Sequence, residues 1–470
     1  MVITHTAHVL QSLDATDDPF AGLRNRLAGQ LLTPGAPEYD EARRTINITL
    51  DRYPLAIVRA ATAGDVKTAV TFARDHSLPL AVRSGGHSLA KLSVVDDALV
   101  VDLSTMKRVQ IDPHTRIGRV QPGATSGDLA GPANAHGLAL TTGDTHSVGM
   151  GGLVTGGGIG FMVRKHGLAI DSLLEAQVVT AAGEIVTASE TEHPDLFWAI
   201  RGGGGNFGIV TEFTFRLAPV GEVLGGALVL PATREVIRGY LEYSTSAPDD
   251  LTTIANVMYA PPAPFIPEQR MGELVLMIWL VWTGSLADGE RALAPLRALA
   301  EPVADAISPI PYPVIYRFTD FAAEPHAASI RMMFADDLSD DAIDATLDAM
   351  KHASSPFALI QIRGLGGEMA RVGRDATAFA HRDRRYFVAI INVWLDATED
   401  ALPHETWTQE LWSILRPEGD GVYVNFLENE GEGRIREAYP EATYARLAEI
   451  KRRYDPENLF RLNQNVAPRA

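Results

Sequence analysis

The first half of the chain alternates between short apolar runs and segments with helical spacing. Apolar runs over 53–60 and 79–83 predict two strands, and the apolar positions between them predict a helix over 61–77. Strand, helix and strand in this order predict a βαβ unit with a right-handed crossover. The second strand ends at the loop 84–88, and α/β proteins place ligands at such strand ends. We therefore expect a ligand beside this loop.

Similar patterns extend to about residue 218, after a first segment, 1–50, that is predicted to be a helical lead-in. Helices are expected at 126–136 and 194–200. Strands are expected at 98–102, 109–112, 117–121, 174–180, 184–188 and 208–216. The fifth of these strands follows the fourth after a short Ala-Gly turn, which is typical of a hairpin.

A change of pattern near Pro219 indicates a domain boundary. From there to about 420 the chain shows longer apolar strands, such as 273–282 and 386–394, and helices such as 289–300. Strands and helices in separate runs favour an α+β unit with an antiparallel sheet. A last helix is expected from 439 to 454, where an Asp-Pro pair ends it.

Charge and composition narrow the function. Among the 470 residues, 41 are basic and 59 acidic, a net charge of −18, which repels nucleic-acid phosphates and anionic membranes. The absence of cysteine excludes disulfides, thiolate catalysis and iron–sulfur clusters. No apolar run reaches the roughly 18 residues of a membrane helix, and the N-terminus lacks the pattern of a signal peptide. We therefore expect a cytoplasmic protein, monomeric or homodimeric, without nucleic-acid or membrane partners.

Four glycine clusters lie within the first half of the chain, at 85–86, 149–152, 156–160 and 202–208. Glycine adopts positive φ freely and lets backbone N–H groups converge on an anion, so a diphosphate is a natural ligand. Tight turns and close packing explain any one cluster equally well. No GK[ST] follows a cluster, and no clean strand precedes 156–160, so neither a P-loop nor a Rossmann fingerprint is expected. A nucleotide bound by another architecture is the resulting prediction.

His87 lies between the first of these glycine pairs and Ser88. A single loop histidine is more often a surface or hydrogen-bonding residue than a functional one. Its exposure to a ligand would suit a base, a metal ligand or a nucleophile. No second histidine or carboxylate lies at metal-ligand spacing, so no metal is expected.

The segment Arg83–Ser88 resembles the covalent flavin attachment loop of berberine-bridge-enzyme-like, FAD-linked oxidases of the vanillyl-alcohol-oxidase superfamily. The other motifs of that family follow in order, at 121–123, 148–152, 156–160, 199–210, 423–425 and 454–465. The resemblance covers roughly residues 50–218 and 420–467, and the combination of motifs is specific where each alone is not.

The resemblance implies an α+β fold with a split, PCMH-type FAD-binding domain. Residues 1–218 would form that domain, 219–420 a substrate domain built on an antiparallel sheet flanked by helices, and 421–470 a segment that returns to the FAD domain. It also implies that the imidazole of His87 is bonded to the 8α-methyl of FAD. Doubly attached relatives carry a cysteine three residues before the position of Val148. Thr145 occupies that position here, so the chain resembles the monocovalent, 6-hydroxynicotine-oxidase-like branch.

The resemblance assigns Tyr423 as the catalytic base, supported by Asn425, and Val148 as the residue that leaves a path for dioxygen. The alternative for Tyr423, which is expected in an alternating strand, is a packed aromatic, and the alternative for Val148 is a β-branched core residue. A phenol base needs a lowered pKa, and its activating partner would come from the other domain. The cofactor-binding residues that the resemblance implies are Arg83, Ser84, Gly85, Gly86, His87, Ser88, Gln121, Pro122, Gly123, Thr142, Gly143, Asp144, Thr145, Val148, Gly149, Gly151, Gly152, Gly156, Gly158, Gly160, Gly208, Val210, Tyr423, Asn463 and Asn465.

The implied function is an oxidase that takes hydride from an alcohol or amine carbon of a small molecule, a sugar or secondary metabolite, and reduces dioxygen to peroxide. A dehydrogenase with another acceptor and a flavin-binding protein without turnover are the alternatives. Strands around 361–363 and 386–394 would roof the pocket, with the inward face of the second strand undecided. Trp279, Trp282 and Trp394 are either sugar-stacking platforms or core residues.

Overall fold

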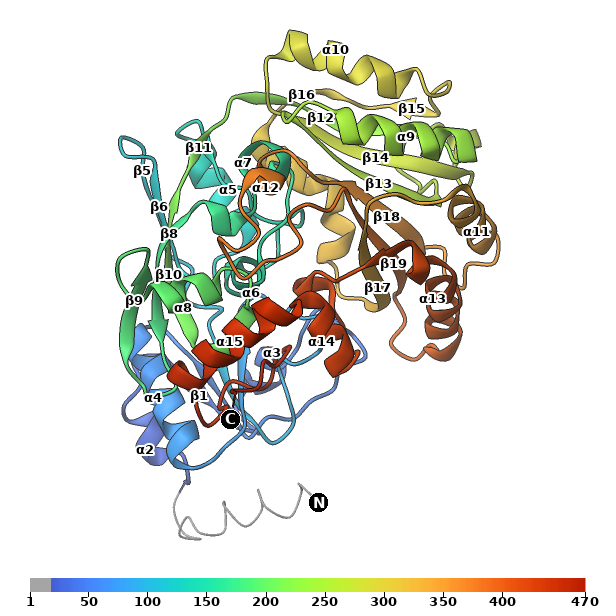
Figure 1. Ribbon diagram of the computed structural model, residues 1–470. Helices are drawn as coiled ribbons and strands as arrows, with labels where there is room; N and C mark the ends of the chain where they lie inside the picture. Colours follow the sequence, from blue (N-terminus) through green and yellow to red (C-terminus); the bar gives the residue numbers. More distant parts are fainter. Residues whose placement is uncertain (1–17, 470) are drawn as a thin grey trace.

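The computed structural model describes residues 18–469, which form two packed halves. Figure 1 shows the N-terminal half in blue to green beside a large sheet in yellow to brown, and the red C-terminal segment returns to the N-terminal half. Within the described residues no helix is both long and apolar enough to cross a membrane. Helices and antiparallel sheets occur together, which confirms the α+β prediction.

The first sheet contains the predicted βαβ unit, in the strand order β1-β2-β4-β3. Strands β2 and β3 both pair in parallel with β4, and α4 connects them. Thr62 and Asp65 form a capping box that begins this helix. The bounds are Gln30–Leu32 for β1, Ala56–Arg59 for β2, Ala63–Asp75 for α4, Leu80–Arg83 for β3 and Leu99–Asp102 for β4.

The second sheet is antiparallel, in the order β5-β6-β10-β8-β9, and includes the predicted hairpin β8–β9. Short helices and a two-stranded ribbon, β7–β11, complete this half. The bounds are Val109–Asp112 (β5), Ile117–Val120 (β6), Ser126–Asn134 (α5), Leu138–Ala139 (β7), Met150–Gly156 (α6), Val163–His166 (α7), Leu173–Val179 (β8), Ile185–Ser189 (β9), Pro194–Ile200 (α8), Ile209–Arg216 (β10) and Ala218–Pro219 (β11).

The third sheet has nine strands, β15-β12-β14-β13-β18-β19-β17-β20, with β16 also paired to β12. All its strand pairs are antiparallel. Its elements are β12 (Glu222–Pro231), α9 (Arg234–Ser246), β13 (Leu251–Tyr259), β14 (Leu274–Trp282), α10 (Leu286–Arg297), β15 (Ala304–Asp305), β16 (Ser308–Pro311), the 3-10 segment η4 (Tyr312–Ala323), β17 (Ala327–Ala335), α11 (Asp340–Met350), β18 (Leu359–Gly364), α12 (Glu368–Arg371), β19 (Tyr386–Trp394), α13 (Leu402–Leu415) and β20 (Gly419–Asp420).

One face of this sheet packs on helices and the other on the N-terminal half. Val388 and Ile390 of β19 belong to the apolar core beneath the helices α9, α11 and α13. Phe387 and Ala389, on the opposite face, join a core that includes Phe213 and other residues of the N-terminal half. The inward face of β19 is therefore that of Phe387, Ala389 and Ile391.

Two sequence expectations differ from the structure. The predicted helical lead-in contains, in its described part, two four-residue helices, α2 (Ala21–Arg24) and α3 (Tyr39–Ala42), and the edge strand β1 between them. Tyr423 does not lie in an alternating strand, since it directly precedes a 3-10 turn, η6 (Val424–Phe426). Gly421, with φ of +66°, turns the chain just before it. Residues 1–17 of the lead-in lie outside the described part.

The C-terminal segment is fixed to the N-terminal half by a buried lysine. It carries α14 (Glu432–Ala438) and α15 (Glu441–Tyr454), the second being the predicted tail helix. The Lys451 ammonium lies 2.6 Å from a carboxylate oxygen of Asp455 and donates to the carbonyl oxygens of Asn206 (2.7 Å) and Phe460 (2.9 Å). The side chains of Lys451 and Asp455 are fully buried. All three ammonium protons therefore have acceptors.

We expect Lys451→Met to lower the free energy of unfolding by about 3 to 5 kcal/mol, because it leaves the Asp455 carboxylate buried without its cation. Denaturant unfolding followed by circular dichroism measures the change. Arg452→Met, on the exposed face of the same helix, is the matched control and should change stability by less than about 0.5 kcal/mol. Equal losses in both variants would contradict this role of Lys451.

Candidate active site

The loop after β3 brings three of the predicted segments together. Ser84 Oγ donates to the carbonyl oxygen of Pro122 at 2.6 Å and accepts from the N–H of Gly151 at 3.3 Å. A Cβ on Gly85 would lie 2.4 Å from the nitrogen of Gly149, so only glycine allows this approach. Arg83 is held by Asp102 at 3.0 Å, at the end of the adjacent strand. The predicted attachment loop, the Gln121–Gly123 turn and the start of α6 therefore form one surface.

His87 is half-buried at the edge of this surface, with Nε2 3.0 Å from Ser147 Oγ. Burial, aided by the nearby His326, His146 and Arg83, lowers the pKa of His87 to about 4. The imidazole is therefore neutral at pH 7 and keeps a nitrogen lone pair, as a nucleophile requires. Ser147 is a site residue that the sequence reasoning missed, although it lies between the predicted Thr145 and Val148.

The glycine run 156–160 forms the centre of the site. Gly157 and Gly158 have φ of +138° and +79°. A Cβ on Gly156 would lie 2.1 Å from Asn425 Oδ1, and one on Gly160 would lie 2.4 Å from the carbonyl oxygen of Thr142. The run is therefore enclosed by the C-terminal segment on one side and by the loop 141–147 on the other. No atom lies within 4 Å of a Cβ position on the exposed Gly152, so the start of α6 faces open space.

Tyr423 is buried over this run, and its phenol oxygen accepts two hydrogen bonds. The N–H of Gly158 and the carboxamide of Asn425 each donate to it at 2.9 Å. The same carboxamide also donates to the carbonyl oxygen of Leu153. Burial raises the pKa of Tyr423, while the Gly158 N–H, Asn425 and the charge of Arg363 act in the opposite direction. Burial prevails, which differs from the lowered phenol pKa that a base was expected to have.

The end of the chain forms a further wall. Asn463 donates to the carbonyl oxygens of Gly205 and Phe460, while Asn206 donates to Gln464 and accepts from Val466. The side-chain oxygens of Asn463 and Asn465 are buried and have no partner among the described residues. The Gly202–Gly208 segment and the predicted Asn463 and Asn465 are thus brought together, which leaves acceptors for a ligand.

The structure gives several other predicted cofactor residues a packing role. A Cβ on Gly123 would lie 1.9 Å from the carbonyl oxygen of Leu103, and one on Gly208 would lie 2.6 Å from Val178. The side-chain oxygen of Gln121 accepts from the N–H of Arg108. Val210 is a buried residue of β10. Packing accounts for three of these positions and a hydrogen bond for Gln121, and the contact of all four with a cofactor stays a prediction.

The loop 141–147 is fixed by the large sheet and by η4. Thr142 is hydrogen-bonded to Tyr316, and Thr319 donates to the carbonyl oxygen of Asp144. The Asp144 carboxylate pairs with Arg363 of β18 at 2.7 Å. Arg363 is 5 % exposed and faces the N-terminal half with Phe387 of β19. It is a site residue that the sequence placed on a roof strand without a role.

The tryptophans do not form an array of stacking platforms. Trp282 is buried and donates to the carbonyl oxygen of Ser285, and Trp394 stacks on His404 on the helix side of the sheet. Trp279 is half-buried against the ring of Phe318. The prediction that Trp282 and Trp394 are core residues is therefore confirmed.

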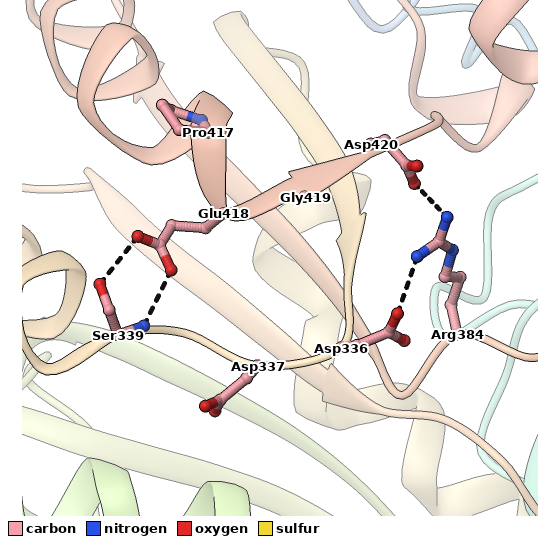
Figure 2. A pocket seen from close by; sticks show the side chains of 8 residues that line it. All are labelled: Asp336, Asp337, Ser339, Arg384, Pro417, Glu418, Gly419 and Asp420. Carbon is pink, nitrogen blue, oxygen red and sulfur yellow. Dashed lines mark hydrogen bonds and ion pairs between the residues drawn. The ribbon is translucent and has the colours of Figure 1, made fainter.

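A depression of about 480 Å³ beside β20 lies apart from this site (Figure 2). Its carboxylates are already partnered, since Asp336 and Asp420 pair with Arg384 and Glu418 accepts from Ser339. None of the predicted site residues lines it. The network joins β20 to the end of β17 and has a structural role.

The residues of the main site fit FAD. Some buried polar atoms of the predicted residues have no hydrogen-bond partner within residues 18–469. They include one donor, on Arg83, and two acceptors, on Asn463 and Asn465. The glycine segments leave backbone close to a ligand without a Cβ between them. A dinucleotide offers diphosphate oxygens and ribose hydroxyls that match such a mixed set. Within the described residues no group of three or more metal-ligating side chains is found.

Comparison with known proteins agrees with this geometry. Residues 54–189 match the family model described as an FAD binding domain, and residues 422–467 match the one described as berberine and berberine like. An FAD-linked oxidoreductase of Bacillus subtilis is 31 % identical over 95 % of this chain and 98 % of its own. The (R)-6-hydroxynicotine oxidase of Paenarthrobacter nicotinovorans is 31 % identical over 94 % of this chain and 97 % of its own.

A solved structure extends this similarity to the fold. The crystal structure of 6-hydroxy-D-nicotine oxidase from Arthrobacter nicotinovorans superimposes with a TM-score of 0.84 and 28 % identity, covering 94 % of this chain and 98 % of that one. The likeness therefore spans both halves of the molecule. The chain is an enzyme that belongs to the berberine-like family of PCMH-type, FAD-linked oxidoreductases.

Proposed function

We propose that this protein is an oxidase that removes a hydride and a proton from an alcohol or amine of a small molecule, a sugar or secondary metabolite. FAD, when bound, accepts the hydride and passes both electrons to dioxygen, which is released as hydrogen peroxide. The substrate carbon is oxidised to a carbonyl or an imine, and the proton leaves through the protein. Oxidases among the relatives support this reaction class.

The residues that would hold FAD come from both ends of the chain. His87 would attach it covalently, and its neutral, half-buried imidazole beside Ser147 supports this assignment. Because the chain has no cysteine, no second covalent bond can form. The glycine segments around 85, 151 and 158, with Asn463 and Asn465, would surround the rest of the cofactor.

The double hydrogen bond to Tyr423 Oη is the observation that carries this proposal. Both Gly158 and Asn425 donate to this oxygen, so neither bond uses the phenol's own proton. Donors directed at an oxygen stabilise its anion more than its neutral form. Tyr423 is therefore arranged to pass through the phenolate, accept the substrate proton and return it to solvent.

The face of the large sheet above Tyr423 combines apolar and polar groups. Phe387, Ala389 and Ile391 supply apolar surface. Beside them a polar row runs from Asn256 through Gln361 to Arg363, and its members are hydrogen-bonded to one another. Such a face suits a small substrate with a flat or ring-shaped body and a few polar groups.

Steady-state oxygen uptake over a panel of sugars, alcohols and cyclic amines tests the proposal. We expect at least one of these substrate classes to drive oxygen consumption, with one hydrogen peroxide formed for each dioxygen consumed. Parallel assays with an artificial acceptor under nitrogen are the control. Turnover with the acceptor but none with oxygen would overturn the oxidase assignment in favour of a dehydrogenase.

Val148→Leu should slow the reaction of the reduced enzyme with oxygen while flavin reduction changes little. Val148 is half-buried against the core at the start of α6, and leucine extends one carbon further towards the site. Val148→Ile adds the same number of atoms with branching at Cβ and should keep fast reoxidation. Stopped-flow measurement of both half-reactions distinguishes the two variants, and equal slowing of both half-reactions by leucine would count against an oxygen path at this position.

A further inference from the structure

Arg363 is a buried cation that connects the roof of the site to the loop beneath it. It projects from β18 towards the N-terminal half, where its guanidinium is 2.7 Å from Asp144 and its Nε donates to Gln361 at 2.7 Å. Asp144 is 17 % exposed, so the pair is only weakly screened by water. Asp144 belongs to the loop 141–147, whereas Arg363 lies 219 residues later in the sequence.

The guanidinium and the Tyr423 ring lie against the same aromatic side chain. The carbon centre of the guanidinium is 5.3 Å from the ring of Phe426 and 4.8 Å from that of Phe387. The Tyr423 and Phe426 rings are stacked with centroids 5.9 Å apart. Arg363 and Tyr423 are both buried, so the field of the guanidinium is only weakly screened by water at the phenol.

The described surroundings of Tyr423 include a second buried cation, Arg382, whose guanidinium carbon is 5.9 Å from the ring of Phe379 and which is paired with Asp171 at 2.7 Å. Gly158 and Asn425 supply neutral donors, and Tyr439 is a second phenol whose pKa burial raises further. His381 lies behind Phe379, which contacts the Tyr423 ring, and burial lowers the pKa of His381. Both groups are therefore neutral at pH 7, and Arg363 contributes the opposing charge.

We propose that Arg363 is the positioning residue that makes the Tyr423 phenol acidic enough to serve as a base, and that Asp144 limits this effect. The inference rests on the proposed function, since it supplies the activating partner of the base. A cation stabilises phenolate, and the adjacent carboxylate opposes it. Asp144 also fixes the guanidinium against Phe387 and Phe426 and couples the base to the loop 141–147.

The ion pair has an alternative role as a clamp between the two halves of the molecule. The two roles predict different patterns of change when each partner is replaced. If the pair acts only as a clamp, loss of Arg363 and loss of Asp144 should weaken the packing of the two halves and change the pKa of Tyr423 in the same direction. If the pair acts through charge, Arg363→Met should raise the pKa of Tyr423, whereas Asp144→Asn should lower it by leaving the cation uncompensated.

A fluorotyrosine placed at position 423 of the holoenzyme reports this directly. Its phenol is more acidic than that of tyrosine, and its fluorine NMR shift follows the ionisation of this single site. At a fixed pH below the titration point we expect about a tenfold lower ionised fraction in Arg363→Met and a higher fraction in Asp144→Asn. Arg363→Lys keeps the cation, so its ionised fraction should remain closer to that of the parent than the fraction in Arg363→Met. Shifts in the same direction for Arg363→Met and Asp144→Asn, or no shift, would overturn the inference.

The pH dependence of flavin reduction in the same variants provides a second measurement. The rising limb should move to higher pH in Arg363→Met and to lower pH in Asp144→Asn. Failure of the proposed base is recognised separately, because Tyr423→Phe would then retain the parent rate while the fluorine titrations still report the influence of Arg363. Thermal unfolding of each variant checks that the two halves remain packed.

Discussion

Tyr423→Phe should reduce the rate of flavin reduction by about a hundredfold to ten-thousandfold, the usual contribution of a well-placed base. Phenylalanine keeps the ring that packs on Phe379 and Phe426, so folding and flavin content should hold. In the proposed mechanism the active form of Tyr423 is the phenolate, and burial raises the pKa of Tyr423 above the usual 10. The parent rate should therefore rise with pH towards that raised pKa, and the variant should lose this rise. Anaerobic stopped-flow measurements across pH provide the test.

Tyr439→Phe is the matched control for this variant. Tyr439 is also a buried phenol near the glycine segments, but its hydroxyl donates to the carbonyl oxygen of Gly202 and receives no pair of donors. We expect it to keep the parent rate to within a few-fold. If Tyr423→Phe behaves in the same way, the base assignment is wrong, and an amine that arrives already neutral becomes the favoured substrate.

His87→Ala should abolish covalent attachment of the flavin entirely. The parent protein, precipitated by acid, should stay yellow and carry the added mass of one FAD, whereas the variant should release its flavin. The variant should also oxidise substrate more slowly, because loss of a bond at the ring edge lowers the flavin potential. Intact-protein mass spectrometry and absorbance of the acid supernatant measure the outcome.

Another histidine near this loop serves as the control. His146 is half-buried and lies 3.0 Å from Asp320, and it is one of the neighbours of His87. His146→Ala should keep the covalent flavin. Since the pKa of His87 is about 4, flavin attachment to apoprotein should proceed equally well at pH 7 and pH 6. Release of the parent's flavin by acid would refute the attachment.

The parts of the fold that followed from the sequence are those with strong local periodicity. The β2–α4–β3 unit combines apolar strands, helical spacing and a Thr62–Asp65 capping box within 28 residues, from 56 to 83. The prediction of a helical lead-in was wrong because the structure of this segment depends on contacts with residues distant in the sequence. Strand β1 exists through pairing with β2, and the N–H groups of Ala28 and Gly29 are held by Asp65. Spacing within the segment carries no sign of these contacts.

The same limit applies to the site. The glycine motifs and His87 could be recognised in the sequence as candidate site residues because their order and residue types are specific. Tyr423 was expected in an alternating strand, but its N–H contacts the sulfur of Met332 rather than a backbone carbonyl of a neighbouring strand. Arg363 and Asp144 meet across 219 positions, and neither position is unusual in its own segment. Only the folded chain brings their charges together.

The position of the C-terminal segment has a consequence for biosynthesis. The proposed site is closed by Tyr423, Asn425, Asn463 and Asn465. The proposed attachment residue, His87, is made 378 residues before the last of them. At a synthesis rate of about 5 to 20 residues per second, roughly 20 to 75 seconds separate the two events on the ribosome. A nascent chain arrested before α15 lacks Lys451 and the wall that it anchors to Asn206. We therefore expect the proposed flavin attachment only after the C-terminal segment has been synthesised and has packed on the N-terminal half.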